Sequence, residues 1–216
     1  MRLFGIDAGF CTTGFSVVDF DESQPTFSSG VLHAECFIPE RPNKLTASKT
    51  LSDVTRVEQT TLRLIDLCLR YLPDVVVVEL PTGGAKSSGA MRGMAYATAM
   101  TCAALFALKK LTPIWTPEFE FITPNANKKG ATGLRVWNVE VAQGKWEVFV
   151  AVKAIWPNVN WPVKRGKRAA EYDDAKCWAI ADSLACVATY LRRKGVTLPE
   201  VTPATLLPQQ PSQTCL

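Results

Sequence analysis

Histidine and paired cysteines are what this sequence lacks most clearly. Its 216 residues include one histidine, His33, and seven cysteines, none of which forms a CxxC pair or a Cys/His cluster. Zinc sites are built from such clusters, so these counts argue against a zinc site of the ordinary kind. Several cysteines stand inside apolar runs, where a reduced thiol behaves as a small hydrophobic side chain. Free thiols of this kind are typical of a reducing compartment.

Long apolar segments are missing as well. No stretch approaches 18 apolar residues without a charge, which argues against a membrane-spanning helix. The N-terminus enters a strand pattern at once, without the basic flank and apolar core of a signal peptide. The sequence therefore predicts a cytoplasmic protein with no membrane partner.

Strong net charge is a third absence, because the chain carries only +4 at pH 7. The positive charge is nevertheless concentrated. Between Lys128 and Arg168 there are nine lysines and arginines against two acids, Glu140 and Glu147. A local excess of this kind favours contact with a polyanion.

The hydrophobic pattern predicts one α/β domain over residues 1–194 and a flexible, proline-rich tail over 195–216. Three β-rich runs follow one another without helical spacers, which favours antiparallel pairing. A later run of four valines is typical of a strand covered on both faces. The predicted strands are 2–7, 14–20, 29–38, 74–79 and 113–116. The predicted helices are 51–72, 89–109, 145–156 and 173–193, with Gly195 as terminator and irregular structure over 119–144.

Two acids stand at the ends of predicted buried strands. Asp7 closes the first strand, and Glu79 follows the four valines. A carboxylate in such a place is costly unless it is paired or bound to a cation. Oxygen ligands select hard ions such as Mg²⁺, and two such ions can stabilise both the attacking and the leaving oxygen of a phosphodiester. The alternative reading, two solvated strand ends, is weaker for the pair than for either acid alone.

The last predicted helix supplies the remaining acids. Asp182 lies between apolar residues, where a lone charge needs a reason. Asp174 precedes it by eight residues, about 80° around the helix, so the two share a broad face. Asp173 points away from Asp182, and both Asp173 and Asp174 also suit a helix N-terminus, where acids stabilise the dipole. Which of these acids completes a metal site stays open at this point.

Four blocks of the chain resemble, in their order, the RuvC-type Holliday junction resolvases of the ribonuclease H-like superfamily, the phage-encoded branch in particular. The blocks are GIDAGFCTTGFSVV, DVVVVELP with GGAKSSGAMRG, ITPNANKKGATG with GKWEVFVAV, and AIADSLACVATY. The resemblance covers roughly residues 1–190, and its first and last blocks are the most specific. It implies a ribonuclease H-like fold, with antiparallel strands 1–3 and further parallel strands in one mixed central sheet flanked by helices.

The resemblance also implies a function, which is Mg²⁺-dependent resolution of four-way DNA junctions by paired nicks in the cytoplasm of a bacterium or phage-infected cell. Two Mg²⁺ ions, replaceable by Mn²⁺, are expected on the positions of the motif, Asp7, Glu79 and Asp182. Family members often carry another acid three or four residues before the last one. Here those positions are Ala179 and Trp178, and Asp174 is the candidate replacement.

Basic residues follow the acids in a pattern that predicts contacts with DNA phosphates. They are Lys86, Arg92, Lys128, Lys129, Lys164, Arg165, Lys167 and Arg168. A homodimer is expected from the family, because a four-way junction has two symmetric cleavage points and a twofold dimer matches that symmetry.

Other functions remain to be separated from this one. The same acids would serve a nuclease acting on other branched or RNA-containing duplexes. The GIDAG and TTG motifs also resemble the phosphate loop of actin-like ATPases, but those enzymes need two such subdomains and an adenosine motif, so no nucleotide cofactor is expected. A non-catalytic junction-binding protein would gain nothing from Asp7, Glu79 and Asp182 beside DNA phosphates.

Overall fold

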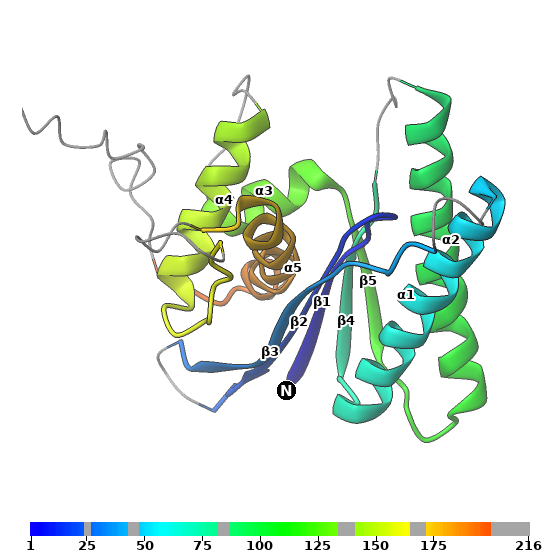
Figure 1. Ribbon diagram of the computed structural model, residues 1–216. Helices are drawn as coiled ribbons and strands as arrows, with labels where there is room; N and C mark the ends of the chain where they lie inside the picture. Colours follow the sequence, from blue (N-terminus) through cyan, green and yellow to red (C-terminus); the bar gives the residue numbers. More distant parts are fainter. Residues whose placement is uncertain (24–26, 43–47, 82–86, 134–140, 165–171, 200–216) are drawn as a thin grey trace, which may run out of the picture.

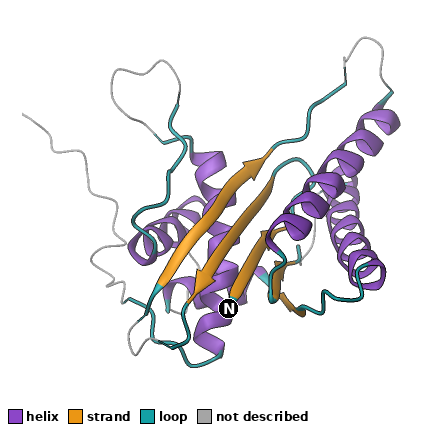
Figure 2. Ribbon diagram, turned by 90° about the horizontal axis from the view of Figure 1, so that it is seen from below, coloured by secondary structure: helices purple, strands orange, loops and turns teal. Residues whose placement is uncertain are grey.

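The computed structural model is a five-stranded mixed sheet with helices on both faces (Figures 1 and 2). It describes residues 1–23, 27–42, 48–81, 87–133, 141–164 and 172–199. The strands are β1 (Arg2–Asp7), β2 (Thr13–Phe20), β3 (Ser29–Phe37), β4 (Val75–Glu79) and β5 (Glu118–Ile122). The helices are α1 (Lys49–Tyr71), α2 (Ser88–Leu111), α3 (Pro124–Thr132), α4 (Val141–Ile155) and α5 (Asp174–Arg193).

The strand order is β3-β2-β1-β4-β5. β1 pairs antiparallel with β2, and β2 with β3, whereas β4 runs parallel to both β1 and β5. The predicted mixed sheet, with three antiparallel strands extended by parallel ones, is therefore confirmed. In this register Asp7 is opposite Gly14 on one side and Glu79 on the other.

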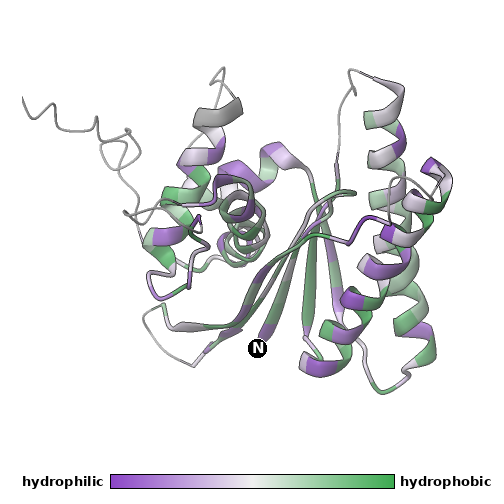
Figure 3. Cartoon of the chain, in the orientation of Figure 1, coloured by the Kyte–Doolittle hydropathy of each residue, from purple (hydrophilic) through white to green (hydrophobic). Residues whose placement is uncertain are grey.

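The sheet is buried on both faces, so the structure has three layers (Figure 3). Val75 and Val77 of β4 belong to the core shared with α4 and α5, while Val76 and Val78 belong to the core shared with α1 and α2. The four valines thus alternate between two apolar cores, as expected for a strand covered on both sides.

Short polar signals set the helix limits. Ser48 and Ser87 each accept a backbone N–H at the starts of α1 and α2, which are typical N-caps. α1 stops before Pro73, as the sequence predicts. α5 ends at Arg193, and Gly195 follows two residues later with a φ of +84°, which glycine adopts easily. The N–H of Gly195 donates to the carbonyl of Arg192 at 3.0 Å.

The strand predicted over residues 113–116 is wrong. Residues 113–116 form no strand, because Pro113 and Ile114 lie in a turn that the N–H of Trp115 closes on the carbonyl of Thr112. The apolar character of this segment has another cause, since Trp115 is buried and its indole donates to the carbonyl of Pro73 at 2.8 Å.

The stretch expected to be irregular contains β5 and α3 instead. β5 is an edge strand with the alternating sequence EFEFI, a half-buried pattern. Thr123 caps α3 and Pro124 takes its first position, which is a recognisable helix start although the helix has little apolar periodicity.

The predicted domain boundary at residue 194 stays a prediction, and two residues beyond it contact α5. The N–H of Val196 donates to the carbonyl of Leu191, and Leu198 is buried in the core beside α5. The predicted tail from residue 200 onward lies outside the described residues.

One helix of the described chain, α2, is by length and composition alone apolar enough to cross a membrane. Core helices of soluble proteins pass the same test, so the observation is weak evidence for a membrane span. It does show that α2 carries apolar residues outside its buried face as well.

Candidate active site

Three carboxylates meet at the carboxyl ends of β1 and β4. Asp7 ends β1 and Glu79 ends β4, and the two are partners in the parallel register. Asp182 comes from the third turn of α5, which packs across this part of the sheet, and its residue is only 8% exposed. Residues far apart in the chain thus share one partly buried site at the sheet end.

Two glycines allow α5 to approach the sheet closely enough to deliver Asp182. A Cβ at Gly5 would overlap the carbonyl oxygen of Ser183, and one at Gly14 would overlap that of Ala179, both well under 3.0 Å. Real Cβ atoms do not make such contacts, so the helix backbone rests directly on these two strands. The role of the two glycines in the site is not visible from sequence periodicity.

Burial and mutual repulsion perturb all three acids. Burial, followed by the charges of Asp182 and Glu79, raises the pKa of Asp7 well above its usual range. Burial and the charge of Asp182 raise the pKa of Glu79 to about 7, although a hydrogen bond from Asn127 opposes the shift. Burial also raises the pKa of Asp182. A positive charge nearby would therefore stabilise the ionised forms of all three carboxylates.

Lys145 supplies part of that charge, and the sequence analysis gave it no role. Its Nζ lies 3.1 Å from Oδ2 of Asp182 and 5.6 Å from the ring centroid of Trp178. Burial works against its charged form, yet the charges of Asp182, Asp7 and Glu79 raise its pKa above the ordinary value. A lysine at the start of a predicted helix within the basic region was the only sequence signal.

Asn127 of α3 is the second neighbour that the sequence analysis missed. Its residue is 1% exposed, and its side-chain NH₂ donates to Oε2 of Glu79 and to the backbone carbonyl of Asp182. A neutral amide next to the motif lysines gives no sequence signal of its own.

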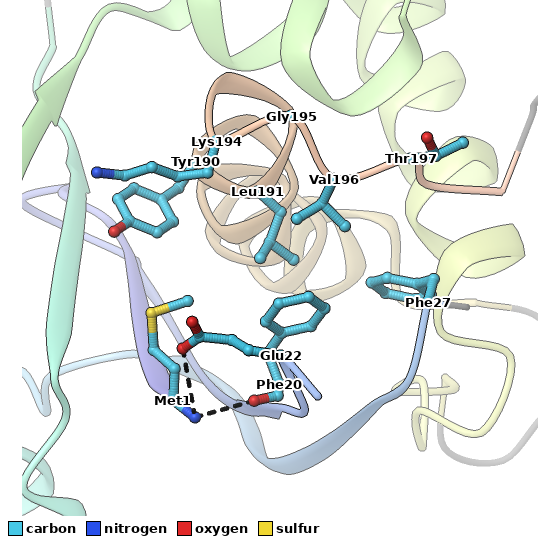
Figure 4. A pocket seen from close by; sticks show the side chains of 10 residues that line it. All are labelled: Met1, Phe20, Glu22, Phe27, Tyr190, Leu191, Lys194, Gly195, Val196 and Thr197. Carbon is cyan, nitrogen blue, oxygen red and sulfur yellow. Dashed lines mark hydrogen bonds and ion pairs between the residues drawn. The ribbon is translucent and has the colours of Figure 1, made fainter. Parts of the chain in front are cut away.

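The carboxylate cluster is distinct from a cavity of about 780 Å³ at the other end of the sheet (Figure 4). Met1, at the start of β1, lines that cavity, and a six-residue strand separates it from Asp7 by about 20 Å. Its cations already have partners, because the Met1 ammonium donates to the carbonyl of Phe20 and Lys194 pairs with Glu118.

Solved structures match the fold of this chain, although no family model and no curated protein matches it. Thermus thermophilus RuvC in complex with a Holliday junction substrate superposes with a TM-score of 0.61 at 19% identity, over 92% of this chain and 99% of that one. The chain has the fold of RuvC. The yeast mitochondrial Holliday junction resolvase Ydc2 superposes with a TM-score of 0.55 at 16% identity, over 89% of this chain and 78% of that one. The resemblance read from the sequence is thus confirmed, whereas assignment to the phage-encoded branch stays a prediction.

Within this RuvC-type fold, the structure does not bring Asp174 to the other acids. It is exposed in the first turn of α5, about 12 Å along the helix from Asp182 at 1.5 Å per residue. The charges that shift the pKa of Asp7 are those of Asp182, Glu79 and Lys145, and Asp174 is not among them. Asp173 is paired with Lys176 at 3.0 Å. Among the described residues, three acids rather than four therefore converge.

The same residues do not form a ready-made metal cage. No group of three or more His, Cys, Asp or Glu side chains in the described part of the chain already has the geometry to hold a metal ion. A bound cation would draw the three carboxylates closer together, because its charge offsets their mutual repulsion.

Four of the eight predicted DNA-binding residues lie in the part of the chain that the structure describes. Lys128 is half-buried and close enough to the site for its charge to act on Glu79 and Asp182, while Lys129 is exposed on the same helix. Arg92 pairs with Asp53 of α1 at 3.4 Å, and Lys164 is exposed. The others lie outside the described residues: Lys86, Arg165, Lys167 and Arg168.

Proposed function

We propose that this chain is a Mg²⁺-dependent endonuclease that resolves four-way DNA junctions by symmetric paired nicks. The observation that carries the proposal is the convergence of Asp7, Glu79 and Asp182 beside two lysines, within the fold of RuvC. The solved T. thermophilus RuvC is itself in complex with a Holliday junction substrate. The site of action proposed is the cytoplasm of a bacterium or a phage-infected cell.

The residues present fit a divalent cation by their chemistry. Asp7, Glu79 and Asp182 offer only oxygen atoms, which is the donor type that Mg²⁺ prefers, and their repulsion is what a cation relieves. Two Mg²⁺ ions, replaceable by Mn²⁺, would be held by Asp7, Glu79 and Asp182. When bound, such ions supply an activated water and stabilise the departing 3′ oxygen of the phosphodiester.

The chain's own residues then hold the reacting groups. Asp7 and Glu79 are fixed to the sheet by their strands, so they hold their ligand at a set position. Lys128 and Lys145 bring positive charge to the edge of the site, where a DNA phosphate can exchange for the carboxylate contact of Lys145. Lys129 and Lys164, both exposed, are available for further phosphate contacts.

The proposed homodimer uses the exposed face of α2. Met91, Ala95, Ala99 and Ala103 follow one another at helical i, i+4 spacing on this face and are exposed. Phe106 continues the apolar surface and is 52% exposed. Self-packing of this face about a twofold axis would set two sites facing one junction.

Light scattering on the purified chain tests the dimer. Ala99→Glu should convert the dimer to a monomer and replace paired nicks by single ones. Leu69→Glu, at an exposed position of α1, is the matched control and should leave the dimer intact. A wild-type chain that is monomeric at junction-cleaving concentrations would refute this part of the proposal.

One incubation separates the proposed function from its alternatives. The purified chain is mixed with a four-way junction, a linear duplex, an RNA–DNA hybrid and ATP, each with Mg²⁺ or EDTA. Metal-dependent paired nicks in the junction alone support the proposal, and preference for the hybrid would favour an RNA-directed nuclease. Junction binding without cleavage under any metal, or ATP turnover without cleavage, would overturn it. Asp7→Asn and Glu79→Gln should abolish cleavage and leave junction binding intact.

A further inference from the structure

Asn127 is a buried amide that links two of the three acids. It lies on α3, and its NH₂ donates to Oε2 of Glu79 at the end of β4. The same NH₂ donates to the backbone carbonyl of Asp182 at 2.9 Å. These contacts join residues 48 and 55 positions apart in the chain. One side chain therefore fixes the distance between a strand-end carboxylate and the helix turn that carries the next one.

The amide can bind in only one orientation. A carboxylate and a backbone carbonyl are both acceptors, so they require the NH₂ rather than the oxygen of the amide. The oxygen faces Thr189, whose hydroxyl lies 3.2 Å from Oδ1 and 3.2 Å from the Asn127 carbonyl. All polar atoms of the buried side chain are thereby satisfied, and its rotamer is held from both sides.

The contact differs in kind from that of Lys145. Lys145 neutralises Asp182 with a positive charge 3.1 Å from its Oδ2. Asn127 adds no charge, and of the two carboxylate oxygens of Glu79 it contacts Oε2 and not Oε1. Neighbours that hydrogen-bond to a ligating carboxylate orient it toward the metal, and removing them typically weakens metal affinity 10- to 100-fold.

We propose that Asn127 is a positioning residue that holds the Glu79 carboxylate in its cation-binding orientation. This inference rests on the proposed function, in which Glu79 is a metal ligand. Asn127 itself touches neither metal nor DNA. Its loss should therefore appear as weaker metal binding rather than as lost junction binding.

Mn²⁺ alone is the probe, titrated into the full-length chain and followed by electron paramagnetic resonance. Asn127→Leu, close in volume but without a donor, should raise the Mn²⁺ dissociation constant by about 10-fold or more. Junction binding in EDTA should stay at the wild-type value, and raised Mg²⁺ should restore cleavage. Thr132→Val is the control, because Thr132 is buried on the same helix and its hydroxyl bonds to the carbonyl of Lys128. It should destabilise α3 without weakening Mn²⁺ binding.

The outcomes separate the inference from the proposed function. Mn²⁺ affinity within twofold of wild type in Asn127→Leu, or an equal loss in Thr132→Val, would overturn the positioning role. A wild-type chain that binds Mn²⁺ but cuts no junction would overturn the proposed nuclease function. The Mn²⁺ affinities of Asn127→Leu and wild type would still test the positioning role of Asn127. If Asn127→Leu fails to fold, the side-chain amide of Asn127 is followed by NMR in the wild-type chain. Its resonances should shift on Mg²⁺ addition, and unchanged resonances would overturn the inference.

Discussion

Replacing Gly14 by alanine tests whether the close approach of α5 builds the candidate site. The added methyl would lie well under 3.0 Å from the carbonyl oxygen of Ala179 and 3.2 Å from the Cβ of Ser183. The first of these atoms belongs to the helix backbone, which cannot rotate away as a flexible side chain can. Either α5 or β2 has to shift.

The cost follows from that geometry. Overpacking a dense core costs roughly 1–3 kcal/mol, and the rigidity of the opposing backbone places Gly14→Ala at the upper end, about 3 kcal/mol. For a chain of this size 1 kcal/mol lowers the melting temperature by about 2–4 °C, so a fall of about 6–12 °C is expected. Because Gly14 is opposite Asp7 in the sheet, a shift of about 1 Å in Asp182 should also slow cleavage about 100-fold.

Thermal and guanidinium unfolding, with junction cleavage measured in parallel, provide the assay. Gly30→Ala on β3 is the matched control, because a Cβ there meets no atom within 4 Å. Its free energy of unfolding should stay within about 0.5 kcal/mol of wild type. If Gly14→Ala is as stable and as active as Gly30→Ala, the close contact between α5 and β2 is not what positions Asp182.

Three further predictions concern the charges of the site. Lys145→Met should lower the free energy of unfolding in EDTA by about 2 kcal/mol, between the values for exposed and buried ion pairs, because Asp182 loses its ion-pair partner. Mg²⁺ should restore most of this loss. An equal loss with and without Mg²⁺ would contradict the role of Asp182 as a metal ligand. The raised pKa of Glu79, about 7 against an ordinary 4.5, means that the native state binds more protons than the unfolded state across that window. Urea unfolding in EDTA should therefore show stability falling as the pH rises from about 4.5 to 7, with a flatter profile in Mg²⁺; a rise would refute the burial argument. Asp182→Asn should slow junction cleavage at least about 100-fold and Asp174→Asn less than about threefold, by analogy with other site carboxylates; the reverse order would make Asp174 the metal ligand.

Local patterns predicted most of the fold because the interactions involved are local. β1 and β4 were found from their apolar runs, and α1 and α5 from helical spacing and their end signals. β5 was missed because it is an edge strand of only five residues, too short for the alternation of its acids and phenylalanines to stand out from the neighbouring loops. Residues 113–116 were misread because the burial of Trp115 has a tertiary cause, its contact with Pro73, and not a strand.

By itself the sequence determined that Asp7 and Glu79 end two buried strands, and that Asp182 is an isolated charge on an apolar helix. Only the tertiary structure decided which groups surround them. Lys145 meets Asp182 across 37 residues and Asn127 meets Glu79 across 48. Such contacts depend on how far and at what angle helices pack on the sheet, which periodicity does not encode. The two glycines under α5 set that distance, and so the same packing that completes the core also gathers the three acids.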